Sequence, residues 1–134
     1  MIPAGFLKAW GGAAAFLLIV DAIWLGLVAR GFYSRQLGEL MLDQPRLSIA
    51  ALFYVMYLAA VVILASAPAF RSGSLTDALM LGAILGFAAY GTYDITNLST
   101  LKNWPLVMSL VDMAWGTLLT AAASAVGFWM LRWS

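Results

Sequence analysis

Three aspartates stand inside long apolar stretches of this sequence, where a charge is costly. They are Asp21, Asp94 and Asp112. An ionised aspartate at the centre of a membrane helix costs about 2.5 to 3.5 kcal/mol on insertion scales, so such side chains face the protein interior or a wet cavity rather than lipid. There they hold a proton, pair with a cation or accept hydrogen bonds. We therefore take these three residues as candidate proton or cation carriers.

Aromatic and amide side chains accompany these acids at helical spacing. Tyr90, Asp94 and Asn97 share one stripe of a helix, and Tyr93 lies beside it. Because hydroxyl and amide groups donate hydrogen bonds to carboxylates, we expect this layer to orient a ligand. Deep tryptophans are weaker candidates, since most of them pack in cores. The other members of the predicted site are Tyr54, Tyr57, Trp24 and Trp115.

The composition places these residues in a membrane. Of the 134 residues, 64% are hydrophobic and 10% are charged, and the mean hydropathy is +0.95. An average soluble domain is about 45 to 50% apolar and about 25% charged, so this chain cannot cover a water-facing surface. A net charge of +1 with scattered Lys and Arg excludes a nucleic-acid partner. The absence of Cys and His excludes thiolate and imidazole ligation, and we expect neither a metal nor a cofactor.

The charges divide the chain into four membrane spans, at about 20 apolar residues per crossing. Pro45 suits a helix start and Pro68 cannot continue a helix, so these prolines bound the second span. Ser74 and Asp77 form a capping-box pattern before the third span. Two of the links are short, which predicts antiparallel neighbours. We expect an all-α polytopic membrane protein, a four-helix antiparallel bundle in one domain over residues 1–134, with spans at about residues 5–29, 47–67, 75–98 and 105–131.

Residues 31–45 form a longer link with amphipathic spacing. One face of a helical wheel carries mainly apolar side chains and the opposite face carries charges. A period of 3.6 residues predicts an interfacial helix in the headgroup plane, and the alternative is a solvated loop. The apolar face holds Tyr33, Leu37, Leu40 and Met41, and the charged face holds Arg35, Glu39 and Asp43.

The predicted topology brings the three aspartates to one level. The first and third spans end, and the second and fourth begin, at the same membrane side. At 1.5 Å per residue, Asp21 lies about 13 Å inside Arg30, and Asp112 lies about 12 Å inside Trp104. Asp94 is late in the third span and falls in the same half of the bundle. The competing interpretation is that these polar groups only join helices, by hydrogen bonds worth about 0.6 to 2 kcal/mol each.

Two short patterns recur in the spans. Asp21 with Trp24 and Asp112 with Trp115 repeat the pattern Asp-x-x-Trp. Because a chain with six tryptophans gives such matches by chance, we infer no inverted repeat from this one. Residues 82–86 match GxxxG, which most simply indicates a close helix contact.

Several of these segments resemble a known family. The segments are residues 21–26 (DAIWLG), residues 32–33 (FY), residues 53–57 (FYVMY), residues 91–101 (GTYDITNLSTL) and residues 112–117 (DMAWGT). They are similar to the bacterial membrane-protein family numbered 2177 among the domains of unknown function, over nearly the whole chain. The resemblance implies a four-helix protein of the bacterial inner membrane and supplies no activity.

The leading functional hypothesis is an integral membrane protein that binds or transports a small molecule, lipid or ion in the polar pocket. Membrane lipids are the expected partners, and a lone four-helix transporter would need a homodimer to enclose a pathway. One alternative is a membrane enzyme that uses a carboxylate pair as acid and base on a lipid. Another is an accessory subunit of a larger membrane complex. Four basic residues on one side against three on the other leave the membrane orientation open.

Overall fold

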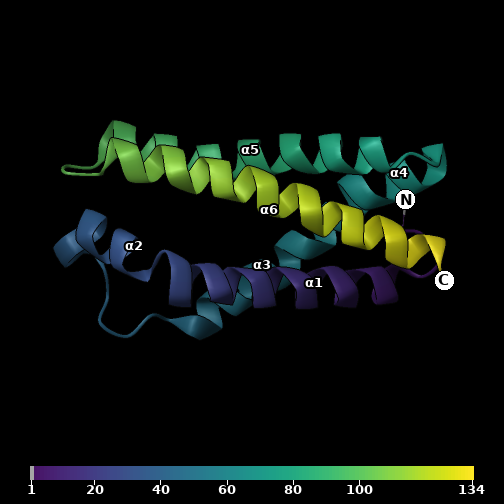
Figure 1. Cartoon of the computed structure of the whole chain (residues 1–134), viewed down its shortest axis with the longest axis horizontal. Coiled ribbons are helices and arrows are strands. Elements are labelled where there is room, and N and C mark those ends of the chain that lie inside the picture. Colours follow the sequence, from purple (N-terminus) through teal and green to yellow (C-terminus); the bar gives the residue numbers. More distant parts are fainter. Residues whose placement is uncertain (1) are drawn as a thin grey trace.

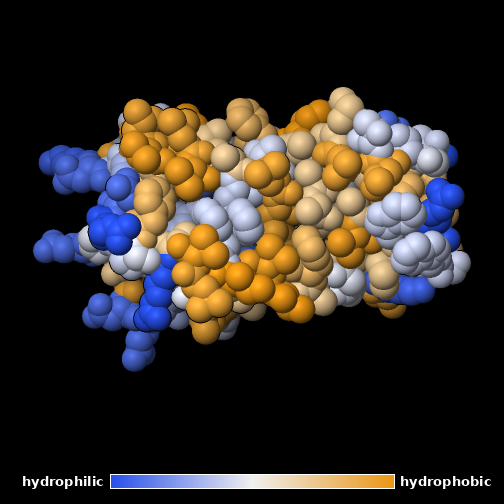
Figure 2. Space-filling view, in the orientation of Figure 1, coloured by the Kyte–Doolittle hydropathy of each residue, from blue (hydrophilic) through white to orange (hydrophobic). Residues whose placement is uncertain are grey.

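The computed structural model describes residues 2–134, and every regular element in that range is a helix. Four helical segments are long and apolar enough to cross a membrane, which confirms the four predicted spans. Figure 2 shows, on the face in view, a broad and mainly apolar middle region between two more hydrophilic ends, as expected for a chain that spans a bilayer. The segments are Phe6–Val28, Leu47–Ser72, Leu75–Thr100 and Leu106–Arg132.

Two of the spans combine α-helix with a π-helical turn. The first consists of α1 (Phe6–Ile23) and η1 (Trp24–Val28). The second consists of α3 (Leu47–Val61), η3 (Val62–Ser66) and α4 (Ala67–Ser72). The third and fourth are the single helices α5 (Leu75–Thr100) and α6 (Leu106–Arg132).

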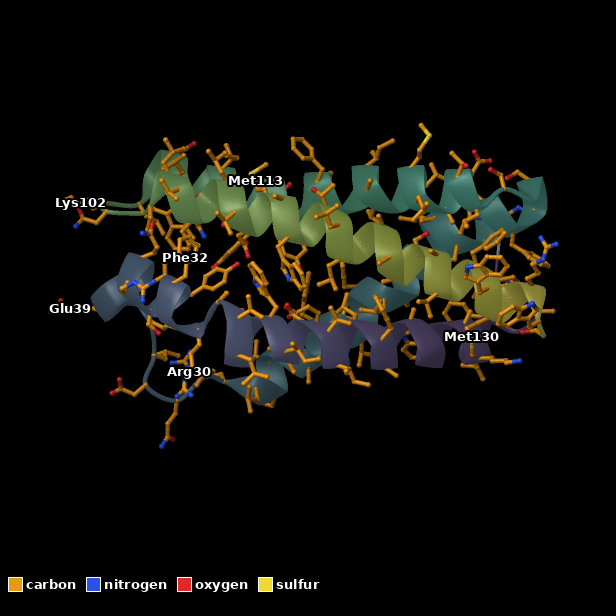
Figure 3. The ribbon with its side chains drawn as sticks, in the orientation of Figure 1. Arg30, Phe32, Glu39, Lys102, Met113 and Met130 are labelled. Atoms are coloured by element: carbon orange, nitrogen blue, oxygen red, sulfur yellow. The ribbon has the colours of Figure 1, made fainter. Side chains whose placement is uncertain are left out.

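The ends of the bundle differ in what they carry. Figure 1 shows both chain termini at one end, and α2 (Arg30–Leu37) with the α5–α6 link at the other. We call these the terminal end and the α2 end. Arg30, Glu39 and Lys102 lie at the α2 end, whereas Met130 lies near the terminal end (Figure 3).

Helix α6 is the centre of the bundle, because α1, α3, α4 and α5 all contact it. The main apolar core joins Leu17 of α1, Leu58 and Val61 of α3 and Leu119 of α6, each of them buried. Burial of this kind offsets the loss of chain entropy, and it also fixes the rotation of each helix about its axis. The polar side chains described below are positioned by this core.

Helices α5 and α6 approach closely along the GxxxG pattern. A Cβ added at Gly86 would lie 2.5 Å from the carbonyl oxygen of Gly116, and one at Gly82 would lie 2.8 Å from the carbonyl oxygen of Thr120. Only glycine allows the two backbones to come this near. The predicted close contact is therefore confirmed. The predicted cap of α5 is confirmed too, since the Asp77 backbone N–H donates to Ser74 Oγ at 3.1 Å.

The second span is longer than predicted, and the prediction that Pro68 ends it was wrong. In the π-helical turn η3, the Ala67 N–H donates to the carbonyl of Val62, five residues earlier. Pro68 then lies at the start of α4, where its missing N–H is not needed. The helix continues to Ser72 and ends at Gly73, which has a left-handed backbone with φ of 73°.

The link after the first span is less helical than predicted. Helix α2 ends at Leu37, and the 3₁₀ turn η2 (Gly38–Leu40) follows it. Gly38 has φ of 55°, which interrupts a regular helix, so the prediction of one helix over residues 31–45 was wrong in its second half. Tyr33 is buried as the apolar face predicts, whereas Leu40 and Met41 are exposed.

Candidate functional site

Asp21 is buried in the bundle and is fully provided with hydrogen-bond donors. Its Oδ1 accepts from Trp115 Nε1 at 3.0 Å, and its Oδ2 accepts from the Tyr54 hydroxyl at 3.2 Å. The donors come from α6 and α3, so this carboxylate of α1 joins three helices. Each carboxylate oxygen has one donor, which is the arrangement that lets an acid remain inside an apolar protein.

Asp112 of α6 accepts a hydrogen bond from outside the four spans. The Tyr33 hydroxyl of α2 donates to Asp112 Oδ1 at 2.9 Å and accepts from Trp24 Nε1 at 3.3 Å. Burial raises the pKa of Tyr33 above its usual range, and the nearby Asp112 carboxylate adds to this shift. Tyr33 therefore keeps its proton at neutral pH and remains a donor to Asp112.

The two Asp-x-x-Trp pairs meet in a crossed arrangement. Trp24 and Trp115 stack with centroids 4.4 Å apart and planes 10° apart. Trp115 donates to Asp21 of the other pair, and Trp24 reaches Asp112 through Tyr33. Trp24 also begins the π-helical turn η1, a feature that is frequent at functional sites. The repeat that we attributed to chance thus corresponds to contacts between the first and fourth spans, two of them direct and one through Tyr33.

Asp94 of α5 is the acid without donors. Its side chain is 0% exposed, and neither carboxylate oxygen has a hydrogen-bond partner within residues 2–134. The charged group that acts on it is the carboxylate of Asp112, which also acts on Asp21. The three acids therefore lie near enough to interact in the α2-end half of the bundle.

A cavity of about 450 Å³ lies between α3, α5 and α6 beside these acids. Its walls are mostly aromatic, and Asp112 supplies the one charged side chain that lines it. Phe53 stacks on Tyr57 with centroids 5.9 Å apart, and the Tyr57 hydroxyl is 2.8 Å from Thr120 Oγ1. The lining residues are Phe53, Tyr54, Tyr57, Ala89, Tyr90, Tyr93 and Asp112.

The cavity opens between α3 and α5. Helix α5 packs against η3 and α4, but it makes hardly any backbone contact with α3, so the two spans separate toward the α2 end. Phe53 and Tyr93 border this gap and are 60% and 54% exposed. Both residues lie within candidate membrane spans, so in a bilayer the exposed side of the gap faces lipid.

A second, larger cavity of about 750 Å³ lies at the α2 end. Its lining includes Arg30 and Asp43, which carry opposite charges. Tyr54 lines both cavities, so the aromatic cavity and this more polar one lie next to each other. The basic residue Arg30 thus lies near the site without lining the aromatic cavity.

Nine of the ten predicted site residues take part in the hydrogen bonds, ring contacts, acid cluster or cavity lining described above, and Asn97 is in none of these. Within the described residues, no hydrogen bond joins the Asn97 side chain to the others. The site also contains residues that we did not predict, namely Tyr33, Phe53, Ala89 and Thr120. Spacing could have indicated Thr120, because Asp112, Gly116 and Thr120 follow one another at four-residue intervals on one helix face.

Gly116 explains how Tyr90 enters the site. A Cβ at Gly116 would overlap the Tyr90 ring, so the ring lies directly against the backbone of α6. The site shows no arrangement for a metal, since no three acidic side chains within residues 2–134 lie close enough to hold an ion. The groups present at the site are carboxylates, hydroxyls and aromatic rings.

These features define a polytopic helical membrane protein with a buried acidic and aromatic site open toward the bilayer. The model of a family described as predicted membrane protein (DUF2177) matches residues 6–129. The chain therefore belongs to the DUF2177 family, as its resemblance in sequence implied. Comparison with curated proteins and with solved structures finds no match.

Proposed function

We propose that this protein binds a small amphiphilic molecule within the membrane, in the aromatic cavity between α3, α5 and α6. The observation that carries the proposal is the cavity itself. Its volume of about 450 Å³ lies within the range of about 300 to 1,000 Å³ that is typical of ligand pockets. Its walls are largely apolar with a few polar groups, the usual composition of such pockets.

The position of the cavity fits a ligand that arrives from the bilayer. The gap between α3 and α5 is bordered by the exposed rings of Phe53 and Tyr93. An amphiphile dissolved in the leaflet would pass between these rings and reach Asp112 without crossing water. The bacterial inner membrane is the compartment in which we propose this binding. Transport in a homodimer is the extension of the same proposal.

The hydrogen bonds around the cavity support a preformed pocket. Tyr54 is held by Asp21, and Tyr57 is held by Thr120. Rings fixed in this way lose little further freedom when a ligand binds, which favours affinity. Asp112 is held through one oxygen by Tyr33 and keeps further acceptor capacity.

Filling the cavity tests the proposal. Ala89 lines it, and its neighbour Ala88 on α5 is exposed on the outside of the bundle. We expect native mass spectrometry of the protein, extracted gently from its own membranes, to detect a bound small molecule on the wild type and on Ala88→Trp but not on Ala89→Trp. The proposal fails if the wild type carries nothing beyond detergent and loosely bound bulk lipid, or if Ala89→Trp keeps the same molecule.

A further inference from the structure

We infer that the ligand of the aromatic cavity is a lipophilic organic cation, an ammonium group on an apolar body, which pairs with Asp112. This inference rests on the proposed function. It concerns the chemical class of the ligand, which the shape of the cavity leaves open. Three observations point to this class of ligand: the charge of the cavity lining, its aromatic walls and the unequal supply of hydrogen-bond donors to the three acids.

The first observation is the charge of the cavity lining. Asp112 lines the cavity, and no Lys or Arg lines it. The charged group that acts on Asp21 and on Asp94 is again a carboxylate, that of Asp112. Negative charge at this depth is costly unless a proton or a cation compensates it. A ligand that brings one positive charge supplies the compensation that the lining residues lack.

The second observation is the aromatic wall of the cavity. Phe53, Tyr57, Tyr90 and Tyr93 line the cavity around the one acid. The face of an aromatic ring attracts a cation through its quadrupole, and rings that surround a site are the usual means of binding quaternary ammonium groups. A neutral apolar ligand would gain contact with these rings but would give the Asp112 carboxylate no partner beyond Tyr33.

The third observation is the unequal supply of hydrogen-bond donors to the three acids. Asp21 has a donor on each oxygen, so the protein itself satisfies it. Asp112 has one donor, Tyr33. Asp94 is fully buried, and within the described residues neither of its oxygens has a partner. Beside the cavity, Asp112 thus has a donor on one oxygen only and its neighbour Asp94 has none, which is the pattern expected where a carboxylate serves a ligand rather than the fold.

The charges also argue against a phospholipid in this cavity. A phosphate group would lie in a cavity whose one charged side chain is Asp112, and like charges repel. Arg30, which suits a phosphate, lines the separate cavity at the α2 end. We therefore assign the aromatic cavity to a cation without an anionic group.

A pair of probes with the same shape tests the charge. Benzyltrimethylammonium and neopentylbenzene differ by one atom, which makes the first a cation and the second neutral. We expect calorimetry on the full chain in a non-ionic detergent to show that the cation binds about tenfold more tightly, or more, than the neutral compound. Asp112→Asn should weaken cation binding by a similar factor and leave the neutral compound unchanged. Asp77→Asn, at the start of α5 and far from the cavity, is the matched control and should change neither.

A second variant covers the case in which Asp112→Asn does not fold. Phe53 is 60% exposed and makes none of the hydrogen bonds of the site, so Phe53→Leu should leave the fold intact. It removes an aromatic face while keeping an apolar side chain. Cation affinity should then fall by about threefold or more, with no comparable loss for the neutral compound. An unchanged cation affinity would overturn the inference.

The outcomes separate the inference from the proposed function. If both probes bind the wild type equally and Ala89→Trp abolishes the binding of both, the cavity binds ligands but the inference of a cationic ligand is wrong. The cation is also wrong if the wild type binds neither probe yet carries a neutral or anionic molecule that Ala89→Trp loses, or if that molecule is a zwitterionic phospholipid. If the wild type binds no probe and carries no molecule, both proposals fail.

Discussion

The three intramembrane aspartates share a residue type and an apolar environment, and they differ in their donors. Asp21 has two donors, Asp112 has one, and Asp94 has none within the described residues. A carboxylate with a full set of donors contributes to the fold, whereas one without them is available for a proton or a ligand. Asp21 therefore joins three helices through its donors, and our proposal places the ligand at Asp112, next to Asp94.

The first prediction concerns the donor to Asp21. Trp115→Phe keeps an aromatic ring against Trp24 but removes the N–H that Asp21 Oδ1 accepts. We expect the free energy of unfolding to fall by about 1 to 2 kcal/mol, because a buried acceptor loses its partner. Thermal unfolding in detergent, followed by circular dichroism, measures the change. The control is Trp133→Phe at the exposed C-terminal end. Equal effects of the two substitutions on stability would show that the hydrogen bond from Trp115 to Asp21 contributes little.

The second prediction concerns Tyr33. Tyr33→Phe removes at once the donor to Asp112 and the acceptor of Trp24. A loss of stability of about 1 to 2 kcal/mol is expected by the same unfolding measurement. Tyr93→Phe is the matched control, because no hydrogen bond of the Tyr93 hydroxyl occurs within residues 2–134 and its ring is half exposed. A larger loss for the control would show that the Tyr33 bond contributes little.

The third prediction follows from the pKa of Tyr33, which burial raises. Unfolding exposes this hydroxyl to water, where it ionises at its ordinary pKa of about 10. Its contribution to stability is therefore complete below about pH 10 and is lost as the pH rises toward the folded-state pKa. As the pH rises from neutral to above about 10, the free energy of unfolding of Tyr33→Phe should therefore fall by less than that of the wild type. Parallel curves of stability against pH for the two proteins would refute the prediction.

The acids of the site could be predicted from the sequence, and the partner Tyr33 could not. Depth along a helix follows from counting residues, which brought Asp21 and Asp112 to one level. Tyr33 was assigned to the apolar face of an interfacial helix, and nothing in its spacing indicates a contact with α6. A contact between segments 79 residues apart depends on how the bundle packs, which the local pattern does not encode.

At the scale of elements, the seam between α5 and α6 sets the position of the site. Gly82 and Gly86 let α5 lie directly against α6, and this brings Asp94 next to Asp112. A separation of the two helices by one side chain would move the acids apart. The close contact between the helices therefore sets the distance between the two acids as well as the packing.

The fourth prediction tests this seam. Gly86→Ala places a Cβ against the Gly116 carbonyl, which cannot move without shifting α6. We expect stability to fall by about 1 to 3 kcal/mol, the usual cost of overpacking. Gly11→Ala on α1 is the control, because no atom lies within 4 Å of its added Cβ. Alanine favours helix over glycine, so this control should be neutral or stabilising. Similar losses for both substitutions, measured by unfolding in detergent, would contradict the close contact.

The spans could be predicted to within a few residues, whereas the two π-helical turns could not. Hydropathy and the Ser74 cap indicated where α5 begins. The π turn η3 needs only a change of one residue in the hydrogen-bond register, and this change let the helix continue past Pro68. Such a shift leaves no periodic signal in the sequence. The positive φ of Gly38 likewise overrides an amphipathic pattern that continues through it.

For the whole molecule, the bundle places both termini at one end (Figure 1). The fifth prediction is that reporters fused after Ser134 and before the first residue report the same side of the membrane. A reporter inserted in the α5–α6 link, next to Lys102, should report the opposite side. Reporters active only in the cytoplasm or only outside it provide the measurement. Opposite locations of the two termini would contradict the arrangement of four spans.

The crossed contacts between the Asp-x-x-Trp pairs carry an evolutionary consequence. Trp115 is the donor to Asp21, and Trp24 serves Asp112 through Tyr33. A lineage that replaces Asp21 would relax selection on Trp115, 94 positions away, and not on Trp24, three positions away. Substitutions should therefore covary between the two motifs: Asp21 with Trp115, and Asp112 with Trp24.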